Sequence, residues 1–315
     1  MKRLLEINSV CGIRSTGRIV TSIAEEFEKN GYEVIVAYGR ENVPPKYKNK
    51  SLRIGSNLSA IFNAFLCRLL DNDGFAAKRQ TKKFIKWAEK FDPDILWIHN
   101  LHGYYINIPV LFKWIKSRPK MEVRWTLHDC WAFTGHCTHF SFVGCNKWQS
   151  ACERCPSKRT YPTSLFFSNA AKNYKLKKQS FLGVQKMTII TPSHWLESLV
   201  KSSYLKPYQV VVKHNAIDLE IFKPTPSNFR KKFNLENKTI VLGVASSWGP
   251  KKGLQDFVKL SSLLDKRFVV VIVGLTNNQI KRMPSDIVCV PNTNSAKELA
   301  EIYTSADVFL HPRPR

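Results

Sequence analysis

Short apolar runs alternate along this chain with segments in which apolar residues recur at helical spacing. Five runs in the first two thirds have the length of strands, and each ends in polar residues: 4–10, 34–38, 94–99, 123–128 and 187–191. After the first run, apolar residues recur at positions 19, 23, 24 and 27, and Gly31 follows where a helix would end. This alternation predicts an α/β fold with a parallel sheet.

The same alternation starts again after the Asn-Ala-Ile-Asp sequence at 215–218 and predicts a second domain. Its clearest strands are 240–245, 268–273 and 308–310, and its clearest helices are 253–264 and 296–304. We count four strands in this part, whereas a doubly wound domain has about five or six. We therefore predict a first domain over residues 1–214 and an incomplete second one over 215–315.

Polar side chains stand at the carboxyl ends of four expected strands, the edge at which open parallel sheets bind ligands. They are Asn8 with Ser9, His99 with Asn100, His128 with Asp129, and Thr191 with Ser193. An isolated histidine is most often structural. His128, however, follows its strand beside a potential phosphate loop, so we treat it as a candidate functional residue.

Two helices expected between residues 58 and 91 have unusual faces. The first carries one continuous apolar stripe of Leu58, Ile61, Phe62, Phe65, Leu66 and Leu69. Such a helix packs in a core, dips into a membrane interface or lines an acceptor groove. The second places Phe84 and Ala88 on one face and six lysine and arginine residues elsewhere. That pattern suits an anionic membrane or a solvated surface.

A glycine-bounded loop, Gly12-Ile-Arg-Ser-Thr-Gly17, joins the first expected strand to the first expected helix. Glycines let the backbone approach a ligand, and a helix N-terminus offers free N–H groups to an anion. The loop is not a P-loop, because Arg-Ile replaces the Lys-Ser/Thr pair after Gly17. We expect Gly12, Ser15, Thr16 and Gly17 to line an anion site, with an ordinary tight turn as the alternative.

A second strand–loop–helix junction carries Ser246, Ser247, Lys251, Lys252 and Gly253. Cations at a helix start oppose the helix dipole, so two lysines there are more easily understood if an anionic ligand is present. With the glycine loop, this junction indicates phosphate-binding groups on both domains. A cleft between them would suit a nucleotide-linked substrate.

Five cysteines crowd into residues 130–155, a segment expected to be an insertion. Cys152-Glu-Arg-Cys155 has the Cys-x2-Cys spacing of zinc sites, and Cys137 and Cys145 would complete a set of four thiolates. A structural zinc would brace such a loop. Disulfides and unligated thiols are the alternatives, and a catalytic Cys–His pair fits the cluster less well.

Composition narrows the class of protein. With 43% hydrophobic and 12% aromatic residues, the chain is neither mainly disordered nor a small disulfide scaffold. No apolar run approaches the ~20 residues that span a bilayer, and the start lacks the pattern of a signal peptide, so we expect a cytosolic protein. The net charge of +25 suits a polyanion: nucleic acid, anionic lipid or a phosphorylated substrate.

Several longer motifs are spread over nearly all of the chain. They are Thr126-Leu-His-Asp-Cys-Trp-Ala-Phe-Thr-Gly-His-Cys137, His99-Asn-Leu-His-Gly-Tyr-Tyr105, Thr191-Pro-Ser-His-Trp-Leu196, Asn215-Ala-Ile-Asp218, Phe222-Lys-Pro224 and Lys252-Gly253. Together they resemble the family-four retaining glycosyltransferases, which have the GT-B fold. The first motif resembles more closely the subgroup of colanic-acid-type exopolysaccharide synthesis.

The resemblance implies two Rossmann-like domains facing a cleft that holds a nucleotide-sugar donor. The first domain would hold a glycan or lipid-linked acceptor, and the second would hold the donor. Lys252 would stabilise the leaving diphosphate, residues 12–17 would approach the donor phosphates, and His128 would contact the transferred sugar. The acceptor-side residues would be His99, Asn100 and Tyr104. Transfer would retain the anomeric configuration and would need no catalytic cofactor.

Two departures from the family pattern bear on activity. Ser246 stands where the family often has Arg, and the family's Glu-x7-Glu motif lies just beyond residues 306–312, whereas this chain ends at Arg315. The resemblance therefore implies a truncated enzyme, or an inactive sugar- or lipid-binding remnant of one. A nucleic-acid binder is disfavoured, since the basic residues are scattered and no such motif occurs. The charge excess suits an anionic membrane, and predicts a peripheral location on its inner face.

Overall fold

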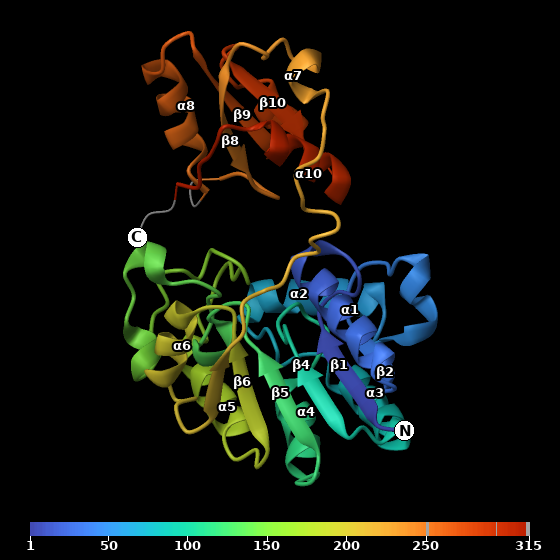
Figure 1. Cartoon of the computed structure of the whole chain (residues 1–315). Helices are drawn as coiled ribbons and strands as arrows, with labels where there is room; N and C mark the ends of the chain where they lie inside the picture. Colours follow the sequence, from blue (N-terminus) through green and yellow to red (C-terminus); the bar gives the residue numbers. More distant parts are fainter. Residues whose placement is uncertain (250–251, 294, 313–315) are drawn as a thin grey trace. The chain divides into compact units, whose positions relative to one another are not determined.

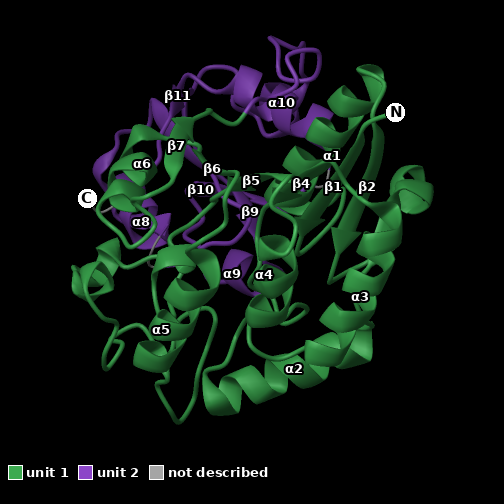
Figure 2. Cartoon of the chain, turned by 90° about the horizontal axis from the view of Figure 1, so that it is seen from below, with its two compact units in different colours: residues 1–215 green, residues 216–315 purple. Residues whose placement is uncertain are grey.

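A computed structural model of the chain describes residues 1–249, 252–293 and 295–312 (Figure 1). The chain divides into two compact units, Met1–Asn215 and Ala216–Arg315, coloured green and purple in Figure 2. Each unit contains its own parallel sheet. The α/β class predicted from the alternation of strands and helices is therefore confirmed.

The first unit is built on a seven-stranded parallel sheet with the order β3-β2-β1-β4-β5-β6-β7. Its strands are β1 (Arg3–Asn8), β2 (Glu33–Tyr38), β3 (Ser51–Arg53), β4 (Ile95–Ile98), β5 (Glu122–Thr126), β6 (Met187–Thr191) and β7 (Gln209–Val212). Chain order reverses between β1 and β4, which makes this junction the switch point at which such sheets bind ligands. β3 and β7 were not predicted, because both are short edge strands that bury few side chains.

Helices cover both faces of this sheet. They are α1 (Arg14–Lys29), α2 (Asn57–Leu70), α3 (Lys78–Phe91), α4 (Ile108–Lys116), α5 (Ala170–Phe181) and α6 (His194–Lys201). Successive side chains of a strand point to opposite faces. Leu4 of β1 accordingly packs with Val20 and Ala24 of α1, whereas Leu5 and Ile7 pack in the core that contains α3 and α4.

The segment predicted as a cysteine-rich insertion contains no regular helix or strand between β5 and α5. It has only three 3₁₀ turns, which are Trp131–Phe133, Ser141–Val143 and Lys147–Gln149. A fourth 3₁₀ turn, Pro45–Lys50, precedes β3. Trp131 and Phe133 are nevertheless fully buried in the main core, so the insertion is anchored to the unit by aromatic side chains.

α2 is not the buried packing helix that we offered as one interpretation of its apolar stripe. Its largest apolar side chains are exposed, with Leu58 at 80% and Phe62 at 60% of full exposure. The residues that it buries are instead Asn63 and Cys67. α3 follows the expected pattern, because it buries Phe84 and Ala88 and leaves its lysines exposed.

The second unit contains a four-stranded parallel sheet with the order β10-β9-β8-β11. Its elements are α7 (Phe229–Lys232), β8 (Thr239–Val244), α8 (Leu254–Leu263), β9 (Phe268–Leu275), α9 (Asn277–Ile280), β10 (Ile287–Pro291), α10 (Ala296–Ser305) and β11 (Val308–Phe309). Val271 packs with Ile302 of α10, whereas Ile272 packs with Phe257 of α8, so helices lie on both faces here too. Within the described parts of the chain, no helix is both long and apolar enough to cross a bilayer.

Candidate functional site

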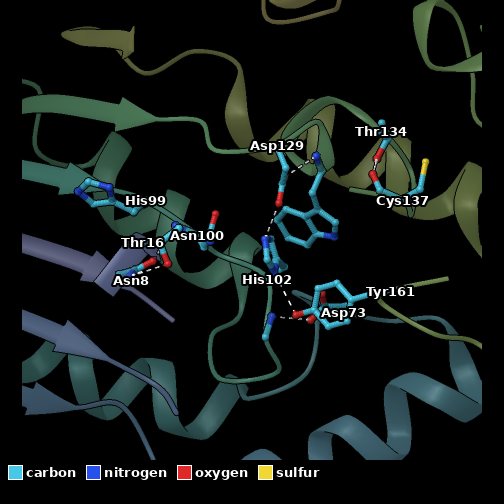
Figure 3. Close-up of polar contacts among 12 residues, drawn as sticks. Asn8, Thr16, Asp73, His99, Asn100, His102, Asp129, Thr134, Cys137 and Tyr161 are labelled. Carbon is cyan, nitrogen blue, oxygen red and sulfur yellow. Dashed lines mark hydrogen bonds and ion pairs between the residues drawn. The ribbon is translucent and has the colours of Figure 1, made fainter. Parts of the chain in front are cut away.

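The loops that follow β1, β4 and β5 meet at one edge of the first unit's sheet, because these strands are neighbours. The predicted residues His99 and Asn100 follow β4, and His128 follows β5. Figure 3 shows His99 and Asn100 near Asn8 and Thr16, which come from β1 and the start of α1. The structure thus brings together candidates that lie more than one hundred residues apart in sequence.

A buried chain of three side chains leads from β1 to His128. Glu6 Oε1 lies 3.4 Å from His99 Nε2, and His99 Nδ1 lies 3.1 Å from His128 Nε2. The two imidazole rings stack with their centres 5.4 Å apart. Glu6 and His99 are fully buried, and His128 is half-buried. Glu6 was not among the predicted residues, although an acidic residue inside an apolar strand is a signal that the sequence contains.

Burial sets the protonation states along this chain. Loss of water raises the pKa of Glu6 well above its ordinary value and lowers the pKa of His99 well below it. Burial also lowers the pKa of His128 to about 4. At neutral pH all three side chains are therefore favoured in their uncharged forms. The 3.1 Å contact between His99 Nδ1 and His128 Nε2 is a hydrogen bond in which one of the two nitrogens carries the proton.

The glycine loop has the geometry of an anion-binding loop. Gly12 has a φ of +71°, and a β-carbon at this position would come within 2.6 Å of the Tyr47 ring, so only glycine fits. The Gly12 N–H donates to the Gly17 carbonyl over 3.1 Å. α1 then begins without a side-chain cap and without an acidic residue in its first turn. Its first N–H groups are therefore open to an anion, with Ser15 exposed beside them.

Asn8 ties the glycine loop to the end of β4 (Figure 3). Its amide nitrogen donates to the Val10 carbonyl over 2.8 Å and to the Thr16 hydroxyl over 3.4 Å. Its amide oxygen accepts from the Asn100 N–H over 3.2 Å. One buried side chain thus holds the start of α1 and the His99 strand end in a fixed relation.

A second buried network is centred on His102, a residue that our sequence-based candidates did not include (Figure 3). His102 Nε2 lies 2.9 Å from Asp129 Oδ2, and His102 Nδ1 lies 3.1 Å from the Tyr161 hydroxyl. Asp129 Oδ1 accepts from the Trp131 N–H over 2.9 Å. Burial alone would lower the pKa of His102 and raise that of Asp129, but their mutual charge reverses both shifts. Where His102 is protonated, the two side chains therefore form a buried ion pair.

Tyr104, predicted on the acceptor side, is itself 8% exposed. Its N–H and that of Gly103 donate to Asp73 Oδ1 over 3.2 and 3.3 Å. The Arg40 guanidinium lies 5.6 Å from the centre of the Tyr104 ring. Tyr104 is therefore a buried residue close to His102 in the chain, and it does not lie on an open surface.

The four cysteines of the predicted zinc set line one cavity of about 10 Å³, with His136 among its walls: Cys137, Cys145, Cys152 and Cys155. The thiols of Cys137 and Cys155 are hydrogen-bonded to each other. None of the described cysteines forms a disulfide. Across the described residues, however, no group of three His, Cys, Asp or Glu side chains is arranged to hold a metal ion. The thiols are thus neighbours without forming a ligand set, and zinc binding stays a prediction.

Metal analysis of the protein purified without chelator is expected to find about one zinc per chain. Cys155→Ser should lower the zinc content, because a thiolate ligand is lost. Cys289→Ser is the matched control, since Cys289 lies on β10 of the second unit. A folded protein that contains no zinc would identify these cysteines as unligated thiols.

In the second unit, the predicted junction between β8 and α8 carries Ser246 and Ser247 as exposed side chains. Gly253 precedes α8 with a φ of +71°, and α8 has no side-chain cap. Lys252 lies directly before Gly253, as the sequence indicates, and Lys251 lies outside the described residues. The uncapped helix start and the lysine favour an anion here, whereas the Asp256 carboxylate in the first turn opposes one.

Comparison with known proteins gives this arrangement a context. No family model matches the chain. Over 190 residues it is 27% identical to an Escherichia coli protein named as a colanic acid biosynthesis glycosyl transferase, WcaC. That match covers 58% of this chain and 45% of WcaC, so the matched region is less than half of the relative's length.

Two solved structures show the fold. Sucrose-phosphate synthase from Thermosynechococcus elongatus has a TM-score of 0.62 at 13% identity, over 99% of this chain and 76% of that one. Anabaena HepE, solved in complex with UDP, has a TM-score of 0.60 at 12% identity, over 100% of this chain and 76% of that one. These neighbours are GT-B proteins, so the predicted GT-B fold is confirmed.

Proposed function

We propose that this protein is a glycosyltransferase that moves a sugar from a nucleotide-sugar donor to a glycan or lipid-linked acceptor in cell-surface polysaccharide synthesis. The observation that carries the proposal is the 27% identity to WcaC, a protein named as a glycosyl transferase of colanic acid biosynthesis. The GT-B fold is consistent with it. The uncapped start of α1 behind Gly12 adds a site of suitable charge for donor phosphates.

Anabaena HepE has been solved with UDP and with UDP-glucose, which supports a nucleotide sugar as the donor. In this proposal the candidate phosphate-binding residues are Gly12–Gly17 in the first unit and Ser246, Ser247 and Gly253 in the second. The acceptor lies with the first unit, on the side of His99, Asn100 and Tyr104.

The proposed reaction retains the anomeric configuration. The acceptor hydroxyl attacks the sugar carbon on the face from which the diphosphate leaves. A departing phosphate oxygen accepts the proton of that hydroxyl as the glycosidic bond forms. Negative charge builds on the diphosphate during this step, and Lys252 together with open N–H groups would stabilise it.

His128 is proposed to orient the transferred sugar. Its neutral state follows from a pKa of about 4, and in the tautomer in which His128 Nε2 accepts from His99 Nδ1, the His128 Nδ1–H is a donor. A hydroxyl of the sugar is a suitable acceptor for this N–H group. Because the pKa of His128 lies well below neutrality, this donor role should persist over the whole neutral pH range.

Isothermal calorimetry of the full chain against UDP-glucose and other nucleotide sugars tests the proposal. Ser246→Asp is expected to weaken donor binding by about tenfold or more, because a carboxylate would face the donor phosphates. Ser262→Asp is the matched control, since Ser262 is exposed on α8 of the same unit. The control should leave the affinity unchanged.

Transfer or donor hydrolysis, followed as release of the nucleoside diphosphate, tests the reaction itself. Absence of binding for every nucleotide sugar, in this chain and in a version extended beyond Arg315, would contradict the proposal. Binding without turnover in both versions would instead identify a sugar-binding protein that lacks transferase activity.

A further inference from the structure

α2 presents its large apolar side chains outward, the reverse of an ordinary surface helix. The exposed fractions are 80% for Leu58, 66% for Ile61, 60% for Phe62 and 53% for Phe65. The opposite side holds the helix in place through polar contact, since the Asn63 amide donates to the Tyr104 carbonyl over 2.9 Å. Figure 2 shows α2 at the periphery of the first unit.

A second exposed apolar segment lies at the C-terminal end of the same helix. Leu165, Phe166 and Phe167 are each at least half exposed. The Leu165 N–H donates to the Arg68 carbonyl over 2.8 Å, and Asn169 Nδ2 donates to the Leu70 carbonyl over 2.6 Å. The segment is therefore fastened beside the last turn of α2, and it extends the apolar surface of that helix.

Cations flank this apolar surface at the other end of α2. A cavity of about 600 Å³ lies between β3, the start of α2 and α3. Its lining includes Arg53, Arg79 and Lys83 and no carboxylate. None of these three takes part in an ion pair found among the described residues. α3 as a whole carries six cations and one acid, Glu89.

We propose that this surface docks on an anionic lipid bilayer. We call it the α2 face, and it consists of Leu58, Ile61, Phe62, Phe65, Leu165, Phe166 and Phe167 with the cations Arg53, Arg79 and Lys83. The aromatic and aliphatic side chains enter the boundary between headgroups and acyl chains, and the cations contact lipid phosphates. Charge complementarity favours lipid over a second copy of this chain, because a second copy carries the same positive excess.

Flotation of the full chain with vesicles tests the α2 face. The protein should float with vesicles that contain phosphatidylglycerol and should bind far less to pure phosphatidylcholine. Phe62→Ser combined with Phe65→Ser should lower the partition coefficient by about tenfold or more, through lost apolar contact. Arg79→Glu combined with Lys83→Glu should lower it by about tenfold or more, with an accompanying loss of salt sensitivity.

Two matched controls keep the result specific. Leu263→Ser removes an apolar side chain that is 82% exposed in the second unit. Lys281→Glu combined with Arg282→Glu makes the same charge change at two exposed residues of that unit. Both controls should float like the unchanged protein. All of the substituted residues are exposed, so circular dichroism should show an unchanged fold.

Three results would overturn the inference. The first is failure of the unchanged protein to float with anionic vesicles. The second is a loss of flotation that is equal in the α2-face variants and in the controls. The third is a dimer in sedimentation that the Phe62→Ser and Phe65→Ser pair converts to monomer, which would assign the face to a second copy. None of these measurements uses a sugar donor, so they fail or succeed independently of the proposed transferase activity.

Discussion

Replacing Asp129 by Asn is expected to destabilise the first unit by about 3 kcal/mol near pH 5. The substitution keeps the shape of the side chain, and Asn can still accept the hydrogen bond of the Trp131 N–H. What it removes is the negative charge 2.9 Å from His102 Nε2. Because both side chains are largely buried, the imidazolium would be left without a countercharge. Urea unfolding followed by tryptophan fluorescence measures the difference in the free energy of unfolding.

The effect of Asp129→Asn should depend on pH in a defined way. The pKa of His102 is raised in the folded protein. Its contribution to the free energy of unfolding is therefore complete below its pKa in the unfolded chain, about 6.5, and is lost as the pH rises through its pKa in the folded protein. The pKa of Asp129 is lowered in the folded protein. Its contribution to the free energy of unfolding is therefore complete above its pKa in the unfolded chain, about 3.9, and is lost as the pH falls through its pKa in the folded protein. The difference between the two proteins should therefore be largest between about pH 4 and 6.5.

Asp286→Asn is the control for the loss of one negative charge. Asp286 is exposed in the second unit, so its free energy of unfolding should change by less than about 0.5 kcal/mol. An Asp129→Asn effect of that same small size at pH 5 would contradict a buried ion pair between His102 and Asp129.

Replacing Lys252 by Ala is expected to lower kcat for sugar transfer by about 10²–10³, with a smaller change in KM. The reason is that the charge on the diphosphate grows as the sugar leaves, so a cation beside it contributes more to the transition state than to the bound donor. Trp248, which comes earlier in the same junction, is held in place because its indole N–H donates to the Val273 carbonyl over 2.8 Å. Steady-state kinetics with the donor identified by calorimetry measures both constants.

Lys259→Ala is the matched control for this change. Lys259 is exposed on α8, and its removal lowers the charge of the same unit by the same amount. Its kcat should stay within about twofold of that of the unchanged protein. A Lys252→Ala protein that loses only donor affinity, at unchanged kcat, would remove Lys252 from the proposed catalytic step and leave it as a binding residue.

Most strands could be predicted because their buried apolar runs need no knowledge of the rest of the fold. β6 and α10 match the predicted bounds to within one residue. β3 and β7 could not be predicted in this way, since an edge strand is paired on one side only and buries less of its length. α4 and α5 also lay outside the named elements, although α4 carries five buried side chains.

The candidate site could be predicted only in part. His99 and His128 were found because each follows a strand, and Gly12 because a glycine loop before a helix is a local pattern. His102 and Asp73 were missed, since nothing local distinguishes their buried imidazole and carboxyl from solvated ones. Glu6 was missed although its place inside an apolar strand was a local signal. The cysteine cluster shows the same limit. Its spacing indicated zinc, whereas the arrangement of the thiols depends on how the insertion packs.

The sequence by itself determined the α/β class, the division into two units and the loops that follow the central strands. Those features depend on local periodicity and on glycine, which act within a few residues. The tertiary structure alone decided the pairing of His102 with Asp129 and the protonation of the Glu6 to His128 chain. It also decided the outward direction of the apolar stripe of α2. These depend on which side chains lose water and which charges face them, and burial is a property of the folded chain rather than of any segment.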